Sequence, residues 1–157
     1  MRAFAEAWYV LAMATNQPAP AKGQFSADAV RRTNDALVAR LLKEGVVIAA
    51  VEACMHHPEG GPGGDPSLVR ACDCRKPLGG MLDALVARLG ADRSRSWMLG
   101  DSVSDVQAAR AAGLRAGLVF ATSRCELCPL KGGPLGLAPD AHGATLAELA
   151  RAILRPG

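Results

Sequence analysis

Four runs of consecutive apolar residues divide this chain of 157 residues. Each run has the pattern of a strand that is buried on both faces of a parallel sheet. The runs cover residues 8–15, 46–51, 96–101 and 115–121. The first ends in Thr15-Asn16-Gln17 and the third in Gly100-Asp101, so polar side chains stand at the carboxyl ends of two predicted strands.

The segments between these runs carry apolar residues at helical spacing. Ser26 is placed to cap a helix that runs to Lys43, Gly90 to end a second helix, and Thr145 with Glu148 to form a capping box. The predicted helices cover residues 26–43, 80–90, 105–113 and 145–155, and residues 1–7 have the pattern of the end of another. This alternation predicts one α/β domain over residues 1–157, with a parallel sheet whose ligands bind at the carboxyl ends of the strands.

Composition excludes two classes of partner. The chain has 18 basic and 15 acidic residues, a net charge of +3, and only 4% aromatic residues. Nucleic-acid-binding proteins usually have a clustered basic surface, and single-stranded RNA is often held by aromatic side chains. A membrane-spanning helix needs about 20 apolar residues in succession, which this sequence lacks. We therefore expect neither a nucleic acid nor a membrane as partner.

Cysteine and histidine residues gather in a long predicted loop, residues 53–77. Cys54 and His56 form a C-x-H pair, and Cys72 and Cys74 form a C-x-C pair. Three thiolates and one imidazole are a closed tetrahedral donor set typical of structural Zn²⁺, and thiolates select zinc over magnesium. A metal would also order a loop with a Gly/Pro-rich centre. A disulfide and a set of unconnected buried cysteines are the alternatives.

One further histidine and two further cysteines are not assigned to the metal site. His57 is interpreted as a loop residue beside the ligand His56, or as one that supports the metal ligands without binding the metal. Cys125 and Cys128 form a C-x-x-C without a second pair, so we expect free thiols there. Cysteines that cluster with histidine favour a metal site in a reducing compartment, and we expect a cytoplasmic protein.

Four short motifs occur along the chain in an informative order. They are T-N-Q at residues 15–17, C-x-H-H-P at 54–58, C-x-C-R-K-P at 72–77 and G-D-x-x-x-D at 100–105. Together they resemble the haloacid dehalogenase (HAD) superfamily, in its branch of heptose-bisphosphate and histidinol-phosphate phosphatases, over nearly the whole chain. The resemblance implies a HAD-like Rossmannoid parallel sheet with helices on both faces. It also implies Mg²⁺-dependent hydrolysis of a phosphomonoester through an aspartyl-phosphate.

The resemblance implies roles for four residues that would surround the phosphoryl group. Lys76 resembles the catalytic lysine that neutralises the phosphoryl oxygens. Thr15 resembles the hydroxyl residue that holds this group, and Asn16 the neighbour that orients the substrate. Arg75 resembles the residue that contacts the substrate.

The resemblance also divides the metals between two roles. Asp101 resembles a ligand of the catalytic Mg²⁺, and Asp105 resembles the acid that supports the lysine or the metal shell. Zinc is then a scaffold, because Arg75 and Lys76 follow its last ligand directly. The implied substrate is a small phosphorylated sugar, and we expect a monomer when the protein is complete.

The substrate is the less specific part of the resemblance. C-x-H-H-P favours the 7-phosphate of D-glycero-D-manno-heptose 1,7-bisphosphate, and histidinol phosphate is the alternative. This sequence has Pro18-Ala19-Pro20 after T-N-Q, where the family commonly has Ser-Gly-Ile, and Leu78 where it usually has a second proline. These departures affect the identity of the substrate more than the class of reaction.

One part of the family pattern has no counterpart in this sequence. The family begins with a central strand that ends in D-x-D-G-T and carries the nucleophile and the general acid/base, whereas no D-x-D occurs here. We therefore expect that the sequence lacks an N-terminal segment and that the chain as given is inactive. The missing strand would leave a gap between the strands that end at Thr15 and Asp101, so the chain would fold poorly or associate through the open sheet. A zinc-stabilised pseudophosphatase and a zinc-knot nucleic-acid binder are the alternatives.

Overall fold

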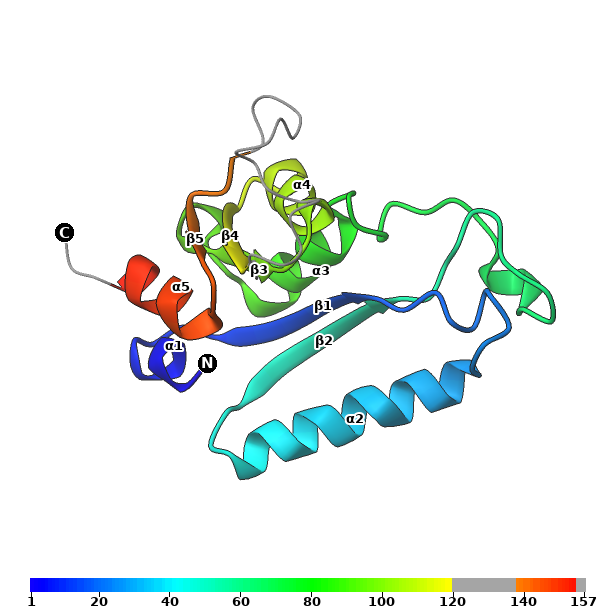
Figure 1. Cartoon of the computed structure of the whole chain (residues 1–157), viewed down its shortest axis with the longest axis horizontal. Coiled ribbons are helices and arrows are strands. Elements are labelled where there is room, and N and C mark those ends of the chain that lie inside the picture. Colours follow the sequence, from blue (N-terminus) through cyan, green and yellow to red (C-terminus); the bar gives the residue numbers. More distant parts are fainter. Residues whose placement is uncertain (120–137, 155–157) are drawn as a thin grey trace.

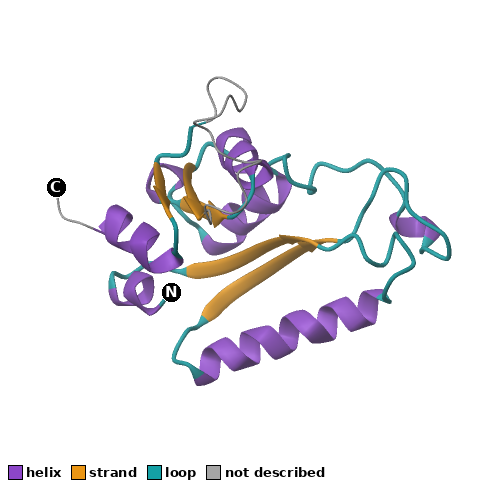
Figure 2. Ribbon diagram, viewed as in Figure 1, coloured by secondary structure: helices purple, strands orange, loops and turns teal. Residues whose placement is uncertain are grey.

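Strands and helices alternate along the chain, as the sequence pattern predicts (Figures 1 and 2). The computed structural model describes residues 1–119 and 138–154. Its strands are β1 (Leu11–Asn16), β2 (Ile48–Cys54), β3 (Trp97–Gly100), β4 (Arg115–Val119) and β5 (Ala141–Gly143). Its α-helices are α1 (Arg2–Glu6), α2 (Ala27–Lys43), α3 (Gly80–Leu89), α4 (Val103–Ala111) and α5 (Leu146–Leu154), and two short 3₁₀ turns lie at Pro66–Leu68 and Arg93–Arg95.

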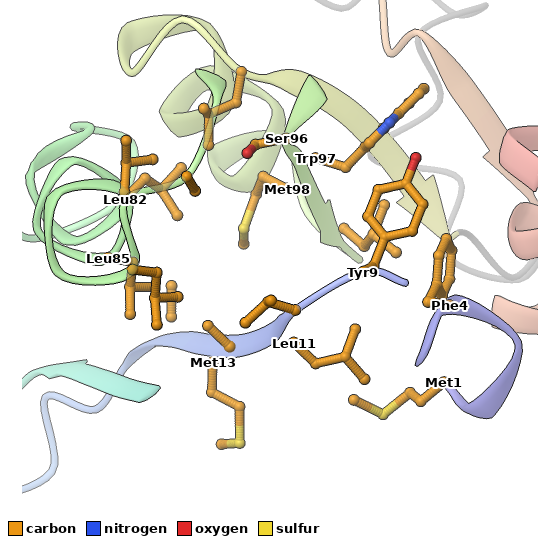
Figure 3. A pocket seen from close by; sticks show the side chains of 18 of the residues that line it. Met1, Phe4, Tyr9, Leu11, Met13, Leu82, Leu85, Ser96, Trp97 and Met98 are labelled. Carbon is orange, nitrogen blue, oxygen red and sulfur yellow. The ribbon is translucent and has the colours of Figure 1, made fainter. Parts of the chain in front are cut away.

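The strands form two parallel sheets. One sheet is the pair β1–β2, and the other has the order β3-β4-β5. The neighbouring strands β1 and β3 are not hydrogen-bonded to each other, which agrees with the gap expected between them. An apolar cavity of about 380 Å³ lies there, and β1, β3 and α3 supply most of its lining (Figure 3). Labelled residues around it include Leu11, Leu85 and Met98.

Helices cover both faces of the structure, which confirms the expected layering. Helix α2 runs below the β1–β2 pair, whereas α3 and α4 lie above it (Figure 1). Helix α3 packs on β1 and β2, and α4 packs on β3 and β4. Ser26 caps α2 by accepting a hydrogen bond from Ala29 N, and Gly90 ends α3 in the left-handed conformation, both as predicted. Among the described residues, no helix combines the length and apolarity that crossing a bilayer would need.

Several element boundaries differ from the sequence-based prediction, and β1 begins at Leu11 rather than at residue 8, because its pairing with β2 starts there. Strand β2 continues to Cys54 rather than ending at residue 51, because its pairing with β1 extends to the last residue of both strands. Helix α4 begins at Val103 rather than 105, because Ser102 and Asp105 form a capping box. Strand β5 lies where the sequence pattern predicts no strand, because its three residues are too few to give a period-two signal. The predicted thiols Cys125 and Cys128 lie outside the described residues.

Candidate active site

The residues Thr15-Asn16-Gln17 lie where β1 ends beside β2. The parallel register pairs Asn16 with Cys54, and Gln17 N donates a hydrogen bond of 2.8 Å to Cys54 O. The side-chain amide of Gln17 also donates to Thr15 Oγ1 at 3.3 Å. The Thr15 hydroxyl therefore accepts from Gln17, and its own proton remains available for a ligand. Thr15 lines the large cavity between β1 and β3.

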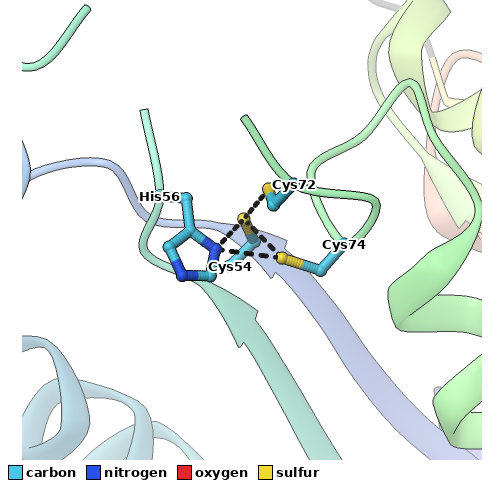
Figure 4. A group of neighbouring side chains, drawn as sticks. All are labelled: Cys54, His56, Cys72 and Cys74. Carbon is cyan, nitrogen blue, oxygen red and sulfur yellow. Dashed lines mark hydrogen bonds between the residues drawn. The ribbon is translucent and has the colours of Figure 1, made fainter. Parts of the chain in front are cut away.

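The four predicted metal ligands come together at the end of β2 (Figure 4). One donor atom from each of Cys54, His56, Cys72 and Cys74 lies within 4.8 Å of the others. The Sγ atoms of Cys54 and Cys74 are 3.0 Å apart, and His56 Nδ1 is 3.3 Å from Cys74 Sγ. All three thiols are free, which contradicts the alternative of a disulfide, and their clustering with His56 contradicts that of unconnected cysteines. A donor set of three sulfurs and one nitrogen this compact fits a tetrahedral metal ion.

The protonation of the three thiols determines how metal binding to this cluster would depend on pH. Burial, together with hydrogen bonds from the other two thiols, raises the pKa of Cys74 far above its ordinary value. Burial also raises the pKa of Cys54. For Cys72, burial acts in the same direction, but hydrogen bonds from Cys74 and the Arg75 backbone outweigh it and lower the pKa. Without a metal, two of the thiols therefore hold their protons tightly. A divalent cation must displace these protons, so metal binding would strengthen as the pH rises.

The histidines have different environments. Burial, and then the charge of Arg70, lower the pKa of His56, which keeps this imidazole neutral and able to act as a ligand. His57 instead accepts hydrogen bonds at Nδ1 from Glu59 N and Gly60 N. The prediction that His57 is a loop residue is therefore confirmed.

The loop that carries the predicted metal ligands, residues 53–77 (the metal loop), contacts the loop that follows β1. Asp65 N donates a hydrogen bond of 3.0 Å to Pro20 O. Gly64 lies against Ala21, and a Cβ at residue 64 would be only 1.9 Å from Ala21 O. This close backbone approach requires glycine. The metal loop therefore fixes the residues that follow T-N-Q as well as those that follow Cys74.

Lys76 is the most tightly held cation of the site. Its Nζ donates hydrogen bonds to Asp105 Oδ1 at 2.6 Å and to Ala14 O at 3.0 Å. The side chains of Lys76 and Asp105 are only 11% and 5% exposed. The ammonium group thus connects the end of β1 to the start of α4, across the carboxyl ends of two strands that belong to different sheets.

Asp105 is held from its other side by the turn between β3 and α4. Its Oδ2 accepts hydrogen bonds from Asp101 N, Ser102 N and Ser102 Oγ at 2.8–3.0 Å. Gly100 makes room for this carboxylate, because a Cβ there would be 2.2 Å from Asp105 Cγ. With both oxygens occupied, Asp105 orients Lys76 and has little capacity left to bind a ligand itself.

A second cavity, of about 330 Å³, opens beside this ion pair. Lys76, Asp101 and Asp105 supply its charged lining. Asp101 is exposed at the end of β3, so its carboxylate is available to a cation or to solvent. Thr15 lines the larger cavity rather than this one. Arg75 is half-buried, and its Nη1 donates to His56 O at 3.4 Å. Among the described residues, Lys76 is therefore the cation that lines the second cavity.

Sequence reasoning missed three contributors to the site. Ser102 caps α4 and binds Asp105, and its S-x-x-D spacing is a capping-box signal that could have revealed it. Gln17 orients the Thr15 hydroxyl, but nothing in its neighbours predicts where its amide points. Arg70 Nη2 lies 2.9 Å from His56 Nε2 across fourteen residues of loop, and no motif connects the two.

Comparison with known protein families identifies a model that matches residues 73–127 and is described as HAD-hydrolase-like. Two relatives are named D-glycero-beta-D-manno-heptose-1,7-bisphosphate 7-phosphatase. The protein from Haemophilus ducreyi is 32% identical over 117 residues, which are 74% of this chain and 62% of the relative. The protein from Rhodopseudomonas palustris is 42% identical over 108 residues, 69% of this chain and 58% of the relative. The chain thus spans about three fifths of the length of these curated relatives.

Two solved structures share the fold. The D,D-heptose 1,7-bisphosphate phosphatase of B. bronchiseptica, crystallised with magnesium and phosphate, superposes with a TM-score of 0.76 at 30% identity, over 96% of this chain and 77% of that one. An HAD-like protein from Mesorhizobium loti, described as a phosphatase, gives a TM-score of 0.75 at 30% identity, over 97% of this chain and 69% of that one.

Proposed function

This chain belongs to the HAD-like phosphatases, and we propose that it forms the phosphoryl-binding part of a Mg²⁺-dependent phosphatase of the cytoplasm. One observation carries the proposal: the Lys76 ammonium is fixed by Asp105 and Ala14 O beside a cavity that Asp101 also lines. In phosphoryl transfer, charge spreads over the equatorial oxygens, so the protein mainly has to supply fixed positive charge and hydrogen-bond donors. Lys76 meets this need without moving.

We propose D-glycero-D-manno-heptose 1,7-bisphosphate as the substrate and its 7-phosphate as the group removed. The names of the relatives from H. ducreyi and R. palustris support this choice. The solved structure from B. bronchiseptica supports it as well, since that protein was crystallised with phosphate.

The residues of the site divide the work as follows in this proposal. Lys76 neutralises the phosphoryl oxygens, and the Thr15 hydroxyl, which lines the neighbouring larger cavity, would donate a hydrogen bond to one of them. Arg75 would contact the sugar or its other phosphate. A carboxylate oxygen attacks phosphorus while the bond to the sugar oxygen breaks and that oxygen takes up a proton. Water then attacks the aspartyl-phosphate, which releases inorganic phosphate and restores the carboxylate.

We do not assign the attacking carboxylate to Asp105, because its oxygens hold Lys76 and the donors of the turn between β3 and α4. We propose that in the complete protein a strand in the gap between β1 and β3 carries this carboxylate. Its carboxyl end would then lie next to Lys76.

The donor groups indicate how two metals would bind. The thiols of Cys54, Cys72 and Cys74 with the imidazole of His56 fit Zn²⁺, in a closed site that serves as scaffold. The Asp101 carboxylate offers the oxygen ligand that Mg²⁺ prefers. When bound, Mg²⁺ would add positive charge next to the phosphoryl oxygens.

The proposal is tested by comparing two variants of the complete protein, including any residues that precede Met1. We expect Lys76→Ala to lower the rate of Mg²⁺-dependent phosphate release from the heptose bisphosphate by roughly 10²–10³-fold, the usual effect of removing one fixed transition-state donor. Bound zinc should be unchanged. The control is Lys43→Ala, which removes an exposed lysine from α2 and should leave the rate as it is. Full activity of Lys76→Ala would refute the role assigned to Lys76.

A further inference from the structure

We infer that Asn16 is a positioning residue that fixes the backbone of Lys76, rather than primarily a ligand of the substrate. The inference rests on the proposed function only in assuming that the site binds a phosphoryl group. Asn16 Oδ1 accepts a hydrogen bond of 3.0 Å from Lys76 N, and Asn16 Nδ2 donates one of 2.9 Å to Lys76 O. The two residues are sixty positions apart in sequence, and both polar atoms of the amide are used on one residue.

With these bonds, β1 holds both the backbone and the ammonium group of Lys76. The side chain of Asn16 holds the lysine backbone, and the carbonyl of Ala14, two residues earlier on the strand, accepts from its Nζ. The lysine is therefore held at both ends by the same strand. Asp105, in the first turn of α4, holds the ammonium group from the side of the other sheet.

This arrangement leaves the ammonium with one direction to act in. A lysine ammonium has three N–H donors, and Ala14 O and Asp105 Oδ1 occupy two of them. One donor remains for a ligand in the cavity that Lys76 lines. Its direction is fixed only while both ends of the residue are fixed, and displacements of about 1 Å can cost 10²-fold in function.

The metal cluster alone does not fix Lys76. Cys74 lies two residues earlier, and Arg75 between them bends into a turn in which Leu78 N donates to Arg75 O. Among the hydrogen bonds of the described residues, those from Asn16 hold both backbone groups of Lys76. Asn16 itself is paired with the predicted metal ligand Cys54 across β1 and β2. The residue that holds Lys76 and the predicted metal site are therefore both positioned by the same pair of strands.

The first test probes the hydrogen bonds between Asn16 and the Lys76 backbone in the absence of any phosphate ligand. Amide hydrogen exchange of the zinc-loaded chain should show Lys76 N–H protected in the wild type. In Asn16→Ala the protection should fall by about tenfold or more, because its acceptor is gone. The matched control is Gln24→Ala, which removes an exposed side-chain amide in the loop after β1 and should leave this proton protected. Unchanged protection in Asn16→Ala would overturn the inference.

The second test is a double-mutant cycle on the affinity for inorganic phosphate in the presence of Mg²⁺, measured by calorimetry. If Asn16 acts through Lys76, Asn16→Ala should weaken binding by about tenfold in the wild type but by less than about twofold when Lys76 is already alanine. Additive effects would mean that Asn16 contacts the anion independently, which would overturn the inference. If the wild type does not bind phosphate, the proposed function fails while the exchange measurement still decides the role of Asn16.

Discussion

At the scale of single residues, the site depends on the nearly buried pair of Lys76 and Asp105. Their charged atoms are 2.6 Å apart, and Asp105 is also held by the turn that follows β3. The motifs C-x-C-R-K-P and G-D-x-x-x-D are enough to assign both residues to the site from the sequence. The direction of the lysine side chain could not be predicted from the sequence. It depends on Ala14 O and the Asn16 amide, which lie some sixty residues away in sequence.

Asp105→Asn should be strongly destabilising, because it leaves the Lys76 ammonium buried without its counter-charge. Breaking a buried ion pair by removing one partner typically costs about 3–5 kcal/mol. Urea unfolding of the metal-loaded chain measures the difference. Asp28→Asn is the control: its carboxylate is 71% exposed and paired with Arg31, so its loss should change stability by less than about 1 kcal/mol. Equal changes in the free energy of unfolding would show that the buried ion pair contributes no more to stability than the exposed one.

Asp140 should give the chain part of its sensitivity to acid. Burial acts to raise the pKa of this carboxyl, but hydrogen bonds from Ala116 N and the Arg110 guanidinium outweigh it and hold the pKa below its ordinary value. A lowered folded-state pKa contributes stability above the unfolded pKa, and this is lost as the pH falls through the folded one. Asp140→Asn should therefore lower stability at neutral pH and flatten its decline below about pH 4. Urea unfolding at several pH values checks this, and an unchanged pH slope would contradict it.

At the scale of elements, the loop of residues 53–77 carries Lys76, and the end of β1 holds the lysine in place. The predicted metal ligands of this loop could be recognised from sequence, because C-x-H and C-x-C pairs have few other uses in one loop. The length of β2 could not, since its extension to Cys54 comes from pairing with β1. The contact of Gly64 with Ala21 was equally hidden, because nothing in either segment indicates that the two backbones meet.

Cys72→Ser should release the metal and loosen the loop together with Lys76. We expect amide exchange of residues 55–76 to accelerate, while the core between α4 and β4 keeps its protection because it does not contact the cluster. A chelator should reproduce this pattern in the wild type and add nothing to the variant. Unchanged exchange in the metal-free loop would refute the scaffold role of the metal.

At the scale of the complete fold, the division into two sheets is the main structural fact. The parallel order and the helical layers followed from the alternation of elements, and the family resemblance pointed to the gap between β1 and β3. The apolar lining of that gap needed the structure, since it comes from strands and helices distant in sequence. Unpaired strand edges beside apolar surface favour association with other chains.

The chain alone should therefore associate with itself as its concentration rises. Leu11→Lys should reduce this association, because it places a charge in the cavity between the sheets. Val47→Lys is the matched control: Val47 is 63% exposed and outside the cavity lining, so adding a charge there should change little. Sedimentation velocity at several concentrations distinguishes the variants, and equal behaviour of both would exclude the cavity as the contact surface.

The proposal that this site binds and helps to transfer a phosphoryl group from a heptose bisphosphate has one direct test. Phosphorus NMR can follow D-glycero-D-manno-heptose 1,7-bisphosphate with the complete protein and Mg²⁺. We predict that the 7-phosphate signal disappears as inorganic phosphate appears, while the 1-phosphate signal remains. A spectrum that does not change with time, or one in which the 1-phosphate is lost first, would contradict the proposal.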